Sequence, residues 1–474
     1  MNVRTLPLIG LVTLLAGCTV GPDFKRPVPP SAAAYLAAGE KADAAVTTGN
    51  APVRWWTAFG SAEMDALVDR ALANNKSLAA SDATLAKAHE QWRAVRGQQL
   101  PQIDVNTRVD QEEINFAAYG FTGQGSNPQF QLYSVGGTAA YDLDLFGRRR
   151  RETEQAGAQA ESQMRQTEAA HLTIAGQVVT QTIMIAAINS RIATVQALIG
   201  DDRKNVDLTD KRRRAGEGTL VQVLTAQSQL ADDQTALPPL YQQLSAATHM
   251  LALLIGVAPS DFTAPTITLA NLTLPATIPV SLPSELVHRR PDILQAEADL
   301  HSATAAIGIA QARMYPDITL GATLAQGSPH IADVLLSSFR GYDLFAGLTA
   351  PIFHGGTLKA ERNEAIDEAK ASDARYQQTV LSAFQQVADL LTALQHDRDT
   401  LAANRQAIDV AGHALQLSRR SFEVGNSGVL DIVDAQRVYQ RAVSASVEAS
   451  ARQYLDSASL FVATAGGWTG VPAH

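Results

Sequence analysis

Two long stretches without proline most strongly constrain how this chain can fold. All twenty prolines lie outside residues 129–237 and 352–471. Proline costs ~3 kcal/mol inside a helix, so both stretches are free to form long helices. Apolar residues recur every seven positions in each stretch, as Val178, Ile185, Ile192, Ile199 and Val206 in the first and as Val387, Leu394, Leu401, Ile408, Leu415 and Phe422 in the second.

A seven-residue repeat sustained in this way indicates a coiled-coil seam. Asp202, Arg398 and Arg405 interrupt the interleaved apolar row, and a helix packed on a soluble bundle is the alternative. Residues 147–215 contain no proline. At ~1.5 Å of rise per residue they can form a rod of about 100 Å. Few compact domains need such a rod, whereas crossing a periplasm does.

The chain is also an internal duplication. Two pairs of segments align between its halves, residues 78–103 with 293–318 and residues 215–227 with 424–436. The first alignment pairs Pro101 with Pro316, and the second pairs Gly216 with Gly425. The two halves therefore share one structural plan.

Each half carries two segments in which apolar and polar residues alternate, which is the period of a β-strand. The positions on the more apolar side are Ile103, Val105, Thr107 and Val109; Tyr133, Val135, Gly137, Ala139, Tyr141 and Leu143; Ile318, Leu320, Ala322 and Leu324; and Tyr342, Leu344, Ala346, Leu348 and Ala350. Each half is thus predicted as helix, strand, loop, strand, long helix, turn, helix. The loops between the strands, Asn115 to Gln129 and Gly327 to Ser338, are expected at the cell surface.

These strands either form one face of a soluble sheet or lie in a membrane with lipid on their apolar side. The other side carries Asp, Asn, Arg and Thr, as a water-filled lumen requires. Tyr133 and Tyr141 lie about 26 Å apart along a strand, close to the ~25 Å apolar band of outer-membrane barrels. We therefore expect membrane strands.

Four strands cannot close a barrel, and an open edge in lipid leaves backbone groups unsatisfied. The chain must complete its barrel with copies of itself. Two copies give eight strands and little room for a pore, whereas three give twelve strands and an open lumen. The residues alone favour three copies only weakly.

The N-terminus has the layout of a secretory signal, with Arg4 followed by an apolar run over residues 6–16. The only cysteine of the chain, Cys18, follows at once. Residues 15–18 (LAGC) resemble a bacterial lipobox. That resemblance implies cleavage after Gly17 and a diacylglyceryl group on Cys18. Thr19 stands where an Asp is the usual signal for retention in the inner membrane, so the outer membrane is expected.

Composition and motifs exclude several functions. A net charge of -9 argues against a nucleic-acid partner. The sequence contains no G-x-S-x-G, H-E-x-x-H, P-loop or G-x-G-x-x-G, and its ten histidines show no ligand spacing. We therefore predict no enzymatic activity, no metal site and no cofactor.

The chain resembles the TolC-type outer-membrane efflux proteins, in the OprM- or NodT-like lipoprotein branch. The segments that carry the resemblance are CTVGPDFKRP (18–27), WWTAFGSAEMDALVDRALANN (55–75), YDLDLFGRRR (141–150) with its repeat partner APIFHGG (350–356), RPDILQAEADL (290–300) and GVLDIVDAQR (428–437). The resemblance implies a mainly α fold with a β-barrel part: a homotrimer sharing a twelve-stranded transmembrane barrel, four strands per chain, above a periplasmic barrel of twelve helices.

The resemblance also implies a function. The protein would be the exit duct of a tripartite efflux pump, working with a periplasmic adaptor and an inner-membrane transporter and anchored in outer-membrane lipid. It would export small molecules such as drugs or toxic compounds. The alternative is a structural periplasmic coiled-coil lipoprotein or adaptor.

The turns near Gly216 and Gly425 should form the periplasmic tips. Asp431 and Asp434 lie three residues apart and hence on one helical face. The resemblance makes them a periplasmic gate, because the family carries lumen-facing acidic residues there; an ordinary solvated face is the alternative. It also makes the tips, with Arg214, Gly216, Gly425 and Gly428, the adaptor-docking region. Phe422 stands where the family often has a tyrosine, so a hydrogen-bonded tyrosine latch is in doubt.

The predicted organisation has six segments. They are a signal peptide (1–17), a lipid-anchored N-terminal segment (18–60), a first repeat (61–257), a proline-rich equatorial connector (258–284), a second repeat (285–466) and a C-terminal tail (467–474).

Overall fold

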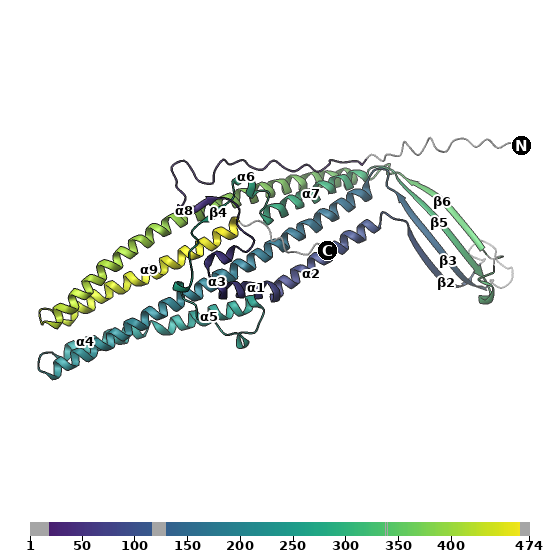
Figure 1. The fold of residues 1–474 in the computed structure, drawn as a ribbon. Helices are drawn as coiled ribbons and strands as arrows, with labels where there is room; N and C mark the ends of the chain where they lie inside the picture. The colour runs from purple at the N-terminus through teal and green to yellow at the C-terminus, as the bar shows by residue number, and fades with distance from the viewer. Residues whose placement is uncertain (1–18, 116–128, 337, 339, 465–474) are drawn as a thin grey trace. The chain divides into compact units, whose positions relative to one another are not determined.

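The computed structural model describes residues 19–115, 129–336, 338 and 340–464 (Figure 1). Within these residues the chain divides into two compact units. The first contains the segment up to Pro27 together with Ala86–Gln163 and Ala296–Tyr376, and the second contains Val28–Leu85, Met164–Gln295 and the chain from Gln377 onward.

The first unit holds an antiparallel sheet of four strands in the order β2-β3-β5-β6. The strands are β2 (Gln102–Glu113), β3 (Gln129–Leu143), β5 (Asp317–Ser328) and β6 (Arg340–Thr349). Each half of the chain supplies one hairpin, as predicted. The short turn η7 (Ile331–Asp333) lies between β5 and β6.

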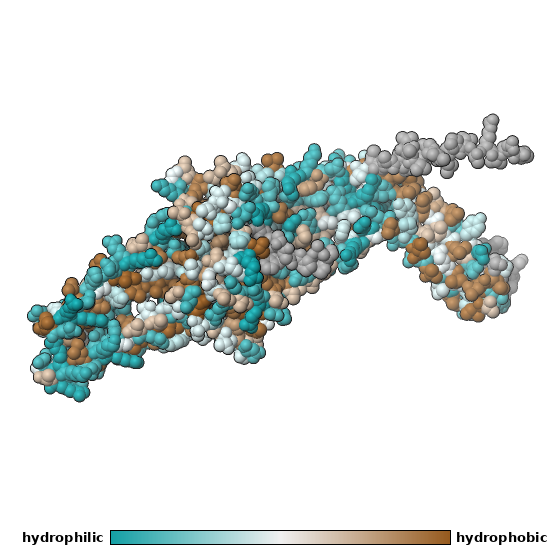
Figure 2. Space-filling view, viewed as in Figure 1, coloured by the Kyte–Doolittle hydropathy of each residue, from teal (hydrophilic) through white to brown (hydrophobic). Residues whose placement is uncertain are grey.

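The register places the predicted apolar positions that lie in the strands on the same face of this sheet; Ala350 follows the last residue of β6. Val105 is opposite Gly137, Gly137 is opposite Leu324, and Leu324 is opposite Tyr342. Directly opposed residues of antiparallel strands share a face, so the four alternating patterns coincide. Large apolar side chains on this face are exposed, and Figure 2 shows apolar residues spread over the strands.

The opposite face is mostly polar or small, although it also carries Phe130, Leu132 and Phe345. One row across all four strands consists of Asp104, Thr138, Thr323 and Asp343. A sheet that exposes one apolar and one polar face is suited to separate lipid from water.

The repeats contribute matching helices. The first half has α1 (Ala62–Asn74), α2 (Lys76–Gly97), α3 (Arg148–Arg214), α4 (Leu220–Gln234) and α5 (Leu237–Ile255), and the second half has α6 (Pro283–Leu286), α7 (Pro291–Ala312), α8 (Thr357–Glu423) and α9 (Val429–Thr464). Both α3 and α8 contain 67 residues. Most of the heptad seam positions are buried, with Val178, Ile185 and Val387 fully inside, whereas Val206 and Ile408 are half-buried.

The halves differ in their last helix. In the second half α9 is one continuous helix, whereas in the first half the corresponding helix is interrupted between α4 and α5. Pro238 and Pro239 stand at the start of α5. Proline is tolerated in the first turn of a helix, where its missing N–H has no intrahelical partner, but not in the interior.

One stretch of α3 is long and apolar enough to cross a membrane by length and composition, with mean hydropathy 1.5. A single such helix is weak evidence for a membrane span. Ile183 and Ile185 of α3 are buried, although only 33% of the apolar stretch is buried.

An aromatic core lies where the N-terminal and connector segments of the second unit meet α9. Trp55, in the turn η3 (Trp55–Phe59), stacks on Phe461 with ring centroids 5.6 Å apart. The Tyr454 hydroxyl donates a hydrogen bond of 2.8 Å to the Leu272 carbonyl. Nearby, β1 (Val46–Thr48) pairs in parallel with β4 (Ile278–Val280), and the connector includes the turns η5 (Pro259–Asp261) and η6 (Leu269–Asn271).

Candidate functional site at the hairpin tips

The turns of the two helical hairpins have the same geometry. Gly216 lies two residues after the end of α3 and Gly425 two residues after the end of α8, each with φ of +80°. This left-handed conformation favours glycine, because a Cβ would crowd the following carbonyl. The same hydrogen bond closes each turn at 2.9 Å, from the Glu217 N–H to the Arg212 carbonyl and from the Asn426 N–H to the Ser421 carbonyl.

The helices leaving the turns are capped at equivalent positions. In the first hairpin, Thr219 and Gln222 form a capping box at the start of α4. In the second, Gly428 replaces the threonine, and its N–H donates a hydrogen bond of 2.9 Å to Asp431 Oδ2. Asp431 therefore caps α9, where the positive end of the helix dipole also favours its charge.

The structure places Asp431 and Asp434 on the exposed side of α9. The neighbouring Ile432 and Val433 are buried and pack toward the hairpin interior. Asp431 and Asp434 thus share one exposed face of α9, and their role at a gate stays a prediction.

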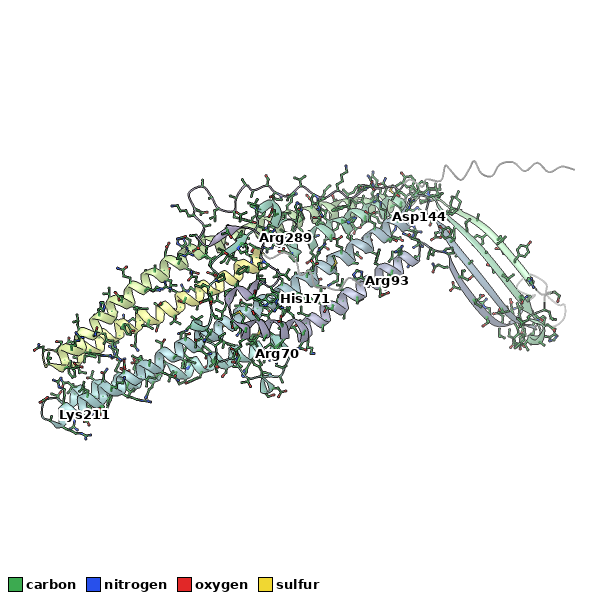
Figure 3. All side chains as sticks on the ribbon, viewed as in Figure 1. Arg70, Arg93, Asp144, His171, Lys211 and Arg289 are labelled. Atoms are coloured by element: carbon green, nitrogen blue, oxygen red, sulfur yellow. The ribbon has the colours of Figure 1, made fainter. Side chains whose placement is uncertain are left out.

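Arg212 joins the two tips. Its guanidinium lies 4.3 Å from the centre of the Phe422 ring, and its Nη1 donates a hydrogen bond of 3.0 Å to the Phe422 carbonyl. The position where the family often has a tyrosine thus holds an aromatic ring in a cation–π contact. Arg214, predicted to dock the adaptor, forms an exposed ion pair of 2.6 Å with Asp210. Figure 3 labels Lys211 beside this turn.

A second contact between the hairpins lies farther from the tips. Arg419 Nη2 on α8 is 2.9 Å from Asp201 Oδ2 on α3. Burial disfavours the charged form of Asp201, but hydrogen bonds and charge from Lys204 and Arg419 outweigh it and lower the pKa of this carboxyl.

A buried polar cluster lies beside this ion pair. Gln436 on α9 donates a hydrogen bond of 2.6 Å to Asp202 Oδ1 and accepts one of 3.0 Å from Asn205. The carboxyl of Asp233 on α4 faces that of Asp202 within hydrogen-bonding reach. Burial, together with the hydrogen bond and charge of Asp233, raises the pKa of Asp202 to about 7.

Sequence reasoning missed most of these contacts, although it held a signal for some. Asp202 and Arg398 were visible as polar interruptions of an apolar seam, and a polar residue in a seam needs a specific partner. Asp202 finds Gln436, and Arg398 pairs with buried Asp43. Arg212 carried no signal beyond its place in a basic run.

The described residues contain no group of three or more His, Cys, Asp or Glu side chains placed to hold a metal ion. Cys18 and the tail at 467–474 lie outside the described residues, as does most of the predicted loop from Asn115 to Gln129.

Two repeats, each joining long helices to a hairpin of a sheet with one apolar face, define the TolC-type class of outer-membrane channel. A sequence model of the family "Outer membrane efflux protein" matches residues 67–257 and 282–466, and the chain belongs to this family.

Three comparisons illustrate the similarity. The pyoverdine export outer membrane protein OpmQ of Pseudomonas aeruginosa is 29% identical over 99% of this chain and 98% of its own. The solved outer-membrane channel OprN has a TM-score of 0.87 and 25% identity, covering 96% of this chain and 100% of that one. The open MtrE channel of Neisseria gonorrhoeae has a TM-score of 0.84 and 25% identity, covering 95% and 99%.

The predicted family, fold class and function are thereby confirmed. The chain is an outer-membrane channel of a tripartite efflux system, with a long periplasmic part. Its relatives are channel proteins rather than enzymes. The alternative of a structural periplasmic lipoprotein or adaptor is set aside.

Proposed function

We propose that three copies of this chain form one exit duct, with a shared twelve-stranded barrel in the outer membrane. The observation that carries this proposal is the sheet: its apolar sets coincide on one exposed face, and β2 and β6 are its edge strands in the described chain. In lipid each unpaired backbone group costs several kcal/mol, so these edges need partners. Edges from further copies satisfy them, and three copies leave a lumen wide enough for cargo.

The duct receives cargo from an inner-membrane transporter through a periplasmic adaptor that docks at the hairpin tips. The docking region includes Arg214, Gly216, Gly425 and Gly428. Two turns of equal geometry on one chain give a trimer six similar tips, which suits an adaptor that binds repeatedly around a ring. The cargo is a small organic molecule, the class to which the pyoverdine in a relative's name belongs.

Cys18 carries the lipid anchor, and the segment after it supports this assignment. The Val20 N–H donates a hydrogen bond of 3.1 Å to the Phe146 carbonyl, at the junction between β3 and α3. Asp23 pairs with Arg151 at 2.7 Å, and Phe24 stacks on His301 with centroids 4.3 Å apart. These contacts hold the residues that follow Cys18 beside the β3–α3 junction, at the end of the sheet. In this proposal the membrane surface lies there.

Asp431 and Asp434 form the periplasmic gate in this proposal. Both are exposed on one side of α9, and threefold symmetry turns each into a ring of carboxylates. A narrow tunnel with low-dielectric walls focuses the field of such rings and attracts cations. The capping bond from Gly428 fixes the side chain of Asp431 within its ring.

Native mass spectrometry of the full chain in detergent tests the trimer, and planar-bilayer recording tests the duct. We expect the mass of three copies and discrete pores of low conductance. A monomeric mass, or membranes that stay silent with the purified trimer, would contradict the proposal.

A further inference from the structure

The two strand-to-helix junctions of the first unit differ in exposure although they are copies of each other. After β3, the ring of Phe146 stacks on Tyr315 with centroids 4.7 Å apart and planes inclined by 19°. After β6, the corresponding Phe353 is 87% exposed and its neighbour Ile352 is 91% exposed. Two adjacent large apolar side chains left this open at the end of an edge strand indicate a missing partner.

The duplication identifies what that partner should be. Tyr315 lies two residues before β5, and its equivalent in the first half is Leu100, two residues before β2. Leu100 is 65% exposed. Within one chain, β2 and β6 lie at opposite edges of the sheet, so Leu100 and Phe353 of the same copy are not neighbours.

We propose that Phe353 of one copy packs on Leu100 of the adjacent copy, repeating between chains the contact that Phe146 and Tyr315 make within a chain. This inference rests on the proposed trimer and adds to it the residues that close each seam between copies. The partner is a second copy of this chain, because only the same sequence supplies an edge strand β2 preceded by Leu100.

The contact also fixes the register between copies. Within the chain, the Phe146–Tyr315 stack continues the β3–β5 ladder, three residues beyond the pair Leu143 and Ile318. If Phe353 and Leu100 extend a ladder between β6 of one copy and β2 of the next in the same way, two apolar pairs lie opposite each other in that ladder. They are Leu348 with Val105 and Leu344 with Val109. All four of these side chains are exposed in the single chain, and the pairing covers part of each.

The polar face fits this register. Phe345 faces Arg108 of the adjacent copy, an arrangement that allows a cation–π contact. Asp343 faces Asp110, whose carboxylate lies 3.5 Å from the same Arg108 within its own chain. The guanidinium thus offsets the like charges that directly opposed aspartates would otherwise present.

Paired cysteines test the proposal in membranes that contain the full chain. The variant with Leu100→Cys and Phe353→Cys should form disulfide-linked dimers and trimers on oxidation, at least tenfold above either single substitution. The single variants also report any cross-link through Cys18. The matched control, Phe146→Cys with Tyr315→Cys, should close within one chain and give only a monomer of altered mobility.

Two further pairs guard against a misleading result. Phe353→Cys with Gln102→Cys is out of register by two residues and should cross-link several-fold less. If the first pair prevents trimer formation, Leu348→Cys with Val105→Cys reads the same register inside the sheet, and Leu348→Cys with Thr107→Cys is its shifted control.

Amine-reactive cross-linking of the same membranes detects trimers independently of the cysteines. It therefore tests the proposed trimer separately from the contact between Phe353 and Leu100. Trimers without disulfides between copies, while the control pair closes within its chain, would overturn the contact and leave the proposed duct intact. Equal linking by the shifted pairs would overturn the register. Absence of trimers in the unmodified protein would remove the proposed duct and this inference with it.

Discussion

At the scale of single residues, neighbouring carboxyl groups of α3 behave in opposite ways. Asp201 faces Arg419 and Lys204, so its pKa is lowered, whereas Asp202 faces Asp233 in a buried site, so its pKa is raised to about 7. Both contact the second hairpin, through Arg419 and Gln436 respectively. The contact between hairpins therefore contains two pH dependences of opposite sign.

Asp202→Asn should remove one of them. A free aspartate titrates near ~3.9. Between that value and about 7 the folded chain retains a proton on Asp202 that the unfolded chain has lost, so stability falls as pH rises through this window. The asparagine stays neutral and still accepts from Gln436. Hydrogen exchange of α4 and α9 should speed up between pH 5 and pH 8 in the unmodified protein but not in the variant, after correction for the intrinsic exchange rate.

Asp201→Asn is the matched control. The lowered pKa of Asp201 gives stability that is present above the unfolded value and lost only in acid. Its substitution should weaken the contact at neutral pH and leave the dependence between pH 5 and pH 8 in place. If the Asp202→Asn variant kept the dependence between pH 5 and pH 8, as the Asp201→Asn variant should, Asp202 would be ionised in the folded chain.

The gate aspartates have a charge test that preserves their structural role. Asp431→Asn with Asp434→Asn keeps a side-chain oxygen to cap α9 but removes both rings of charge. In planar bilayers the double variant should lose cation preference and block by trivalent cations from the periplasmic side. Unchanged selectivity and block would identify both residues as solvated. Asp431→Ala should in addition destabilise the start of α9, because the Gly428 N–H loses its acceptor.

At the scale of elements, the strands are the parts whose two faces meet different solvents. Leu344 and Asp343 are adjacent in β6, yet they point to the apolar and the polar face. In this proposal a new side chain at position 344 therefore faces lipid, whereas the same side chain at position 343 faces water.

Leu344→Arg should destabilise the barrel by roughly 2–4 kcal/mol, the cost of a basic residue near the middle of the lipid face, whereas Asp343→Arg should be tolerated. The amount of heat-resistant trimer in outer-membrane fractions measures both. Similar losses for the two variants would show that the apolar face is covered by protein.

At the scale of the whole molecule, anchorage is divided between lipid and barrel. Cys18→Ser should abolish labelling with fatty acid, while the purified variant still assembles into trimers, because the strands themselves bind the membrane. Metabolic labelling and native mass spectrometry measure the two properties. Labelling that persists in the variant would remove the lipobox interpretation.

The direction of the sheet across the membrane is a further whole-molecule property. An epitope tag inserted after His330, in the predicted loop from Gly327 to Ser338, should be reached by antibody on intact cells. The matched insertion at the turn beside Gly216 should be reached only after permeabilisation. The reverse pattern would mean that the strands are inverted.

Periodicity and duplication made most of the fold predictable. The seven-residue seams of α3 and α8 and the alternation in β2, β3, β5 and β6 are local patterns, and each depends only on which face of an element meets water. The turns at Gly216 and Gly425 were equally local, because their left-handed backbone favours one residue type.

What the sequence could not determine are contacts between residues far apart in the chain. Arg212 on Phe422, Asp202 with Gln436, and Phe24 on His301 each join segments more than 200 residues apart. Their geometry depends on how the helices pack, and no local pattern encodes which of several basic or acidic residues will meet a given partner. The sequence by itself determined the elements and the faces they expose, because these follow from period and chirality. Only the tertiary structure decided which charges are paired, which carboxyl is buried beside another, and which apolar residues remain open at the sheet edges.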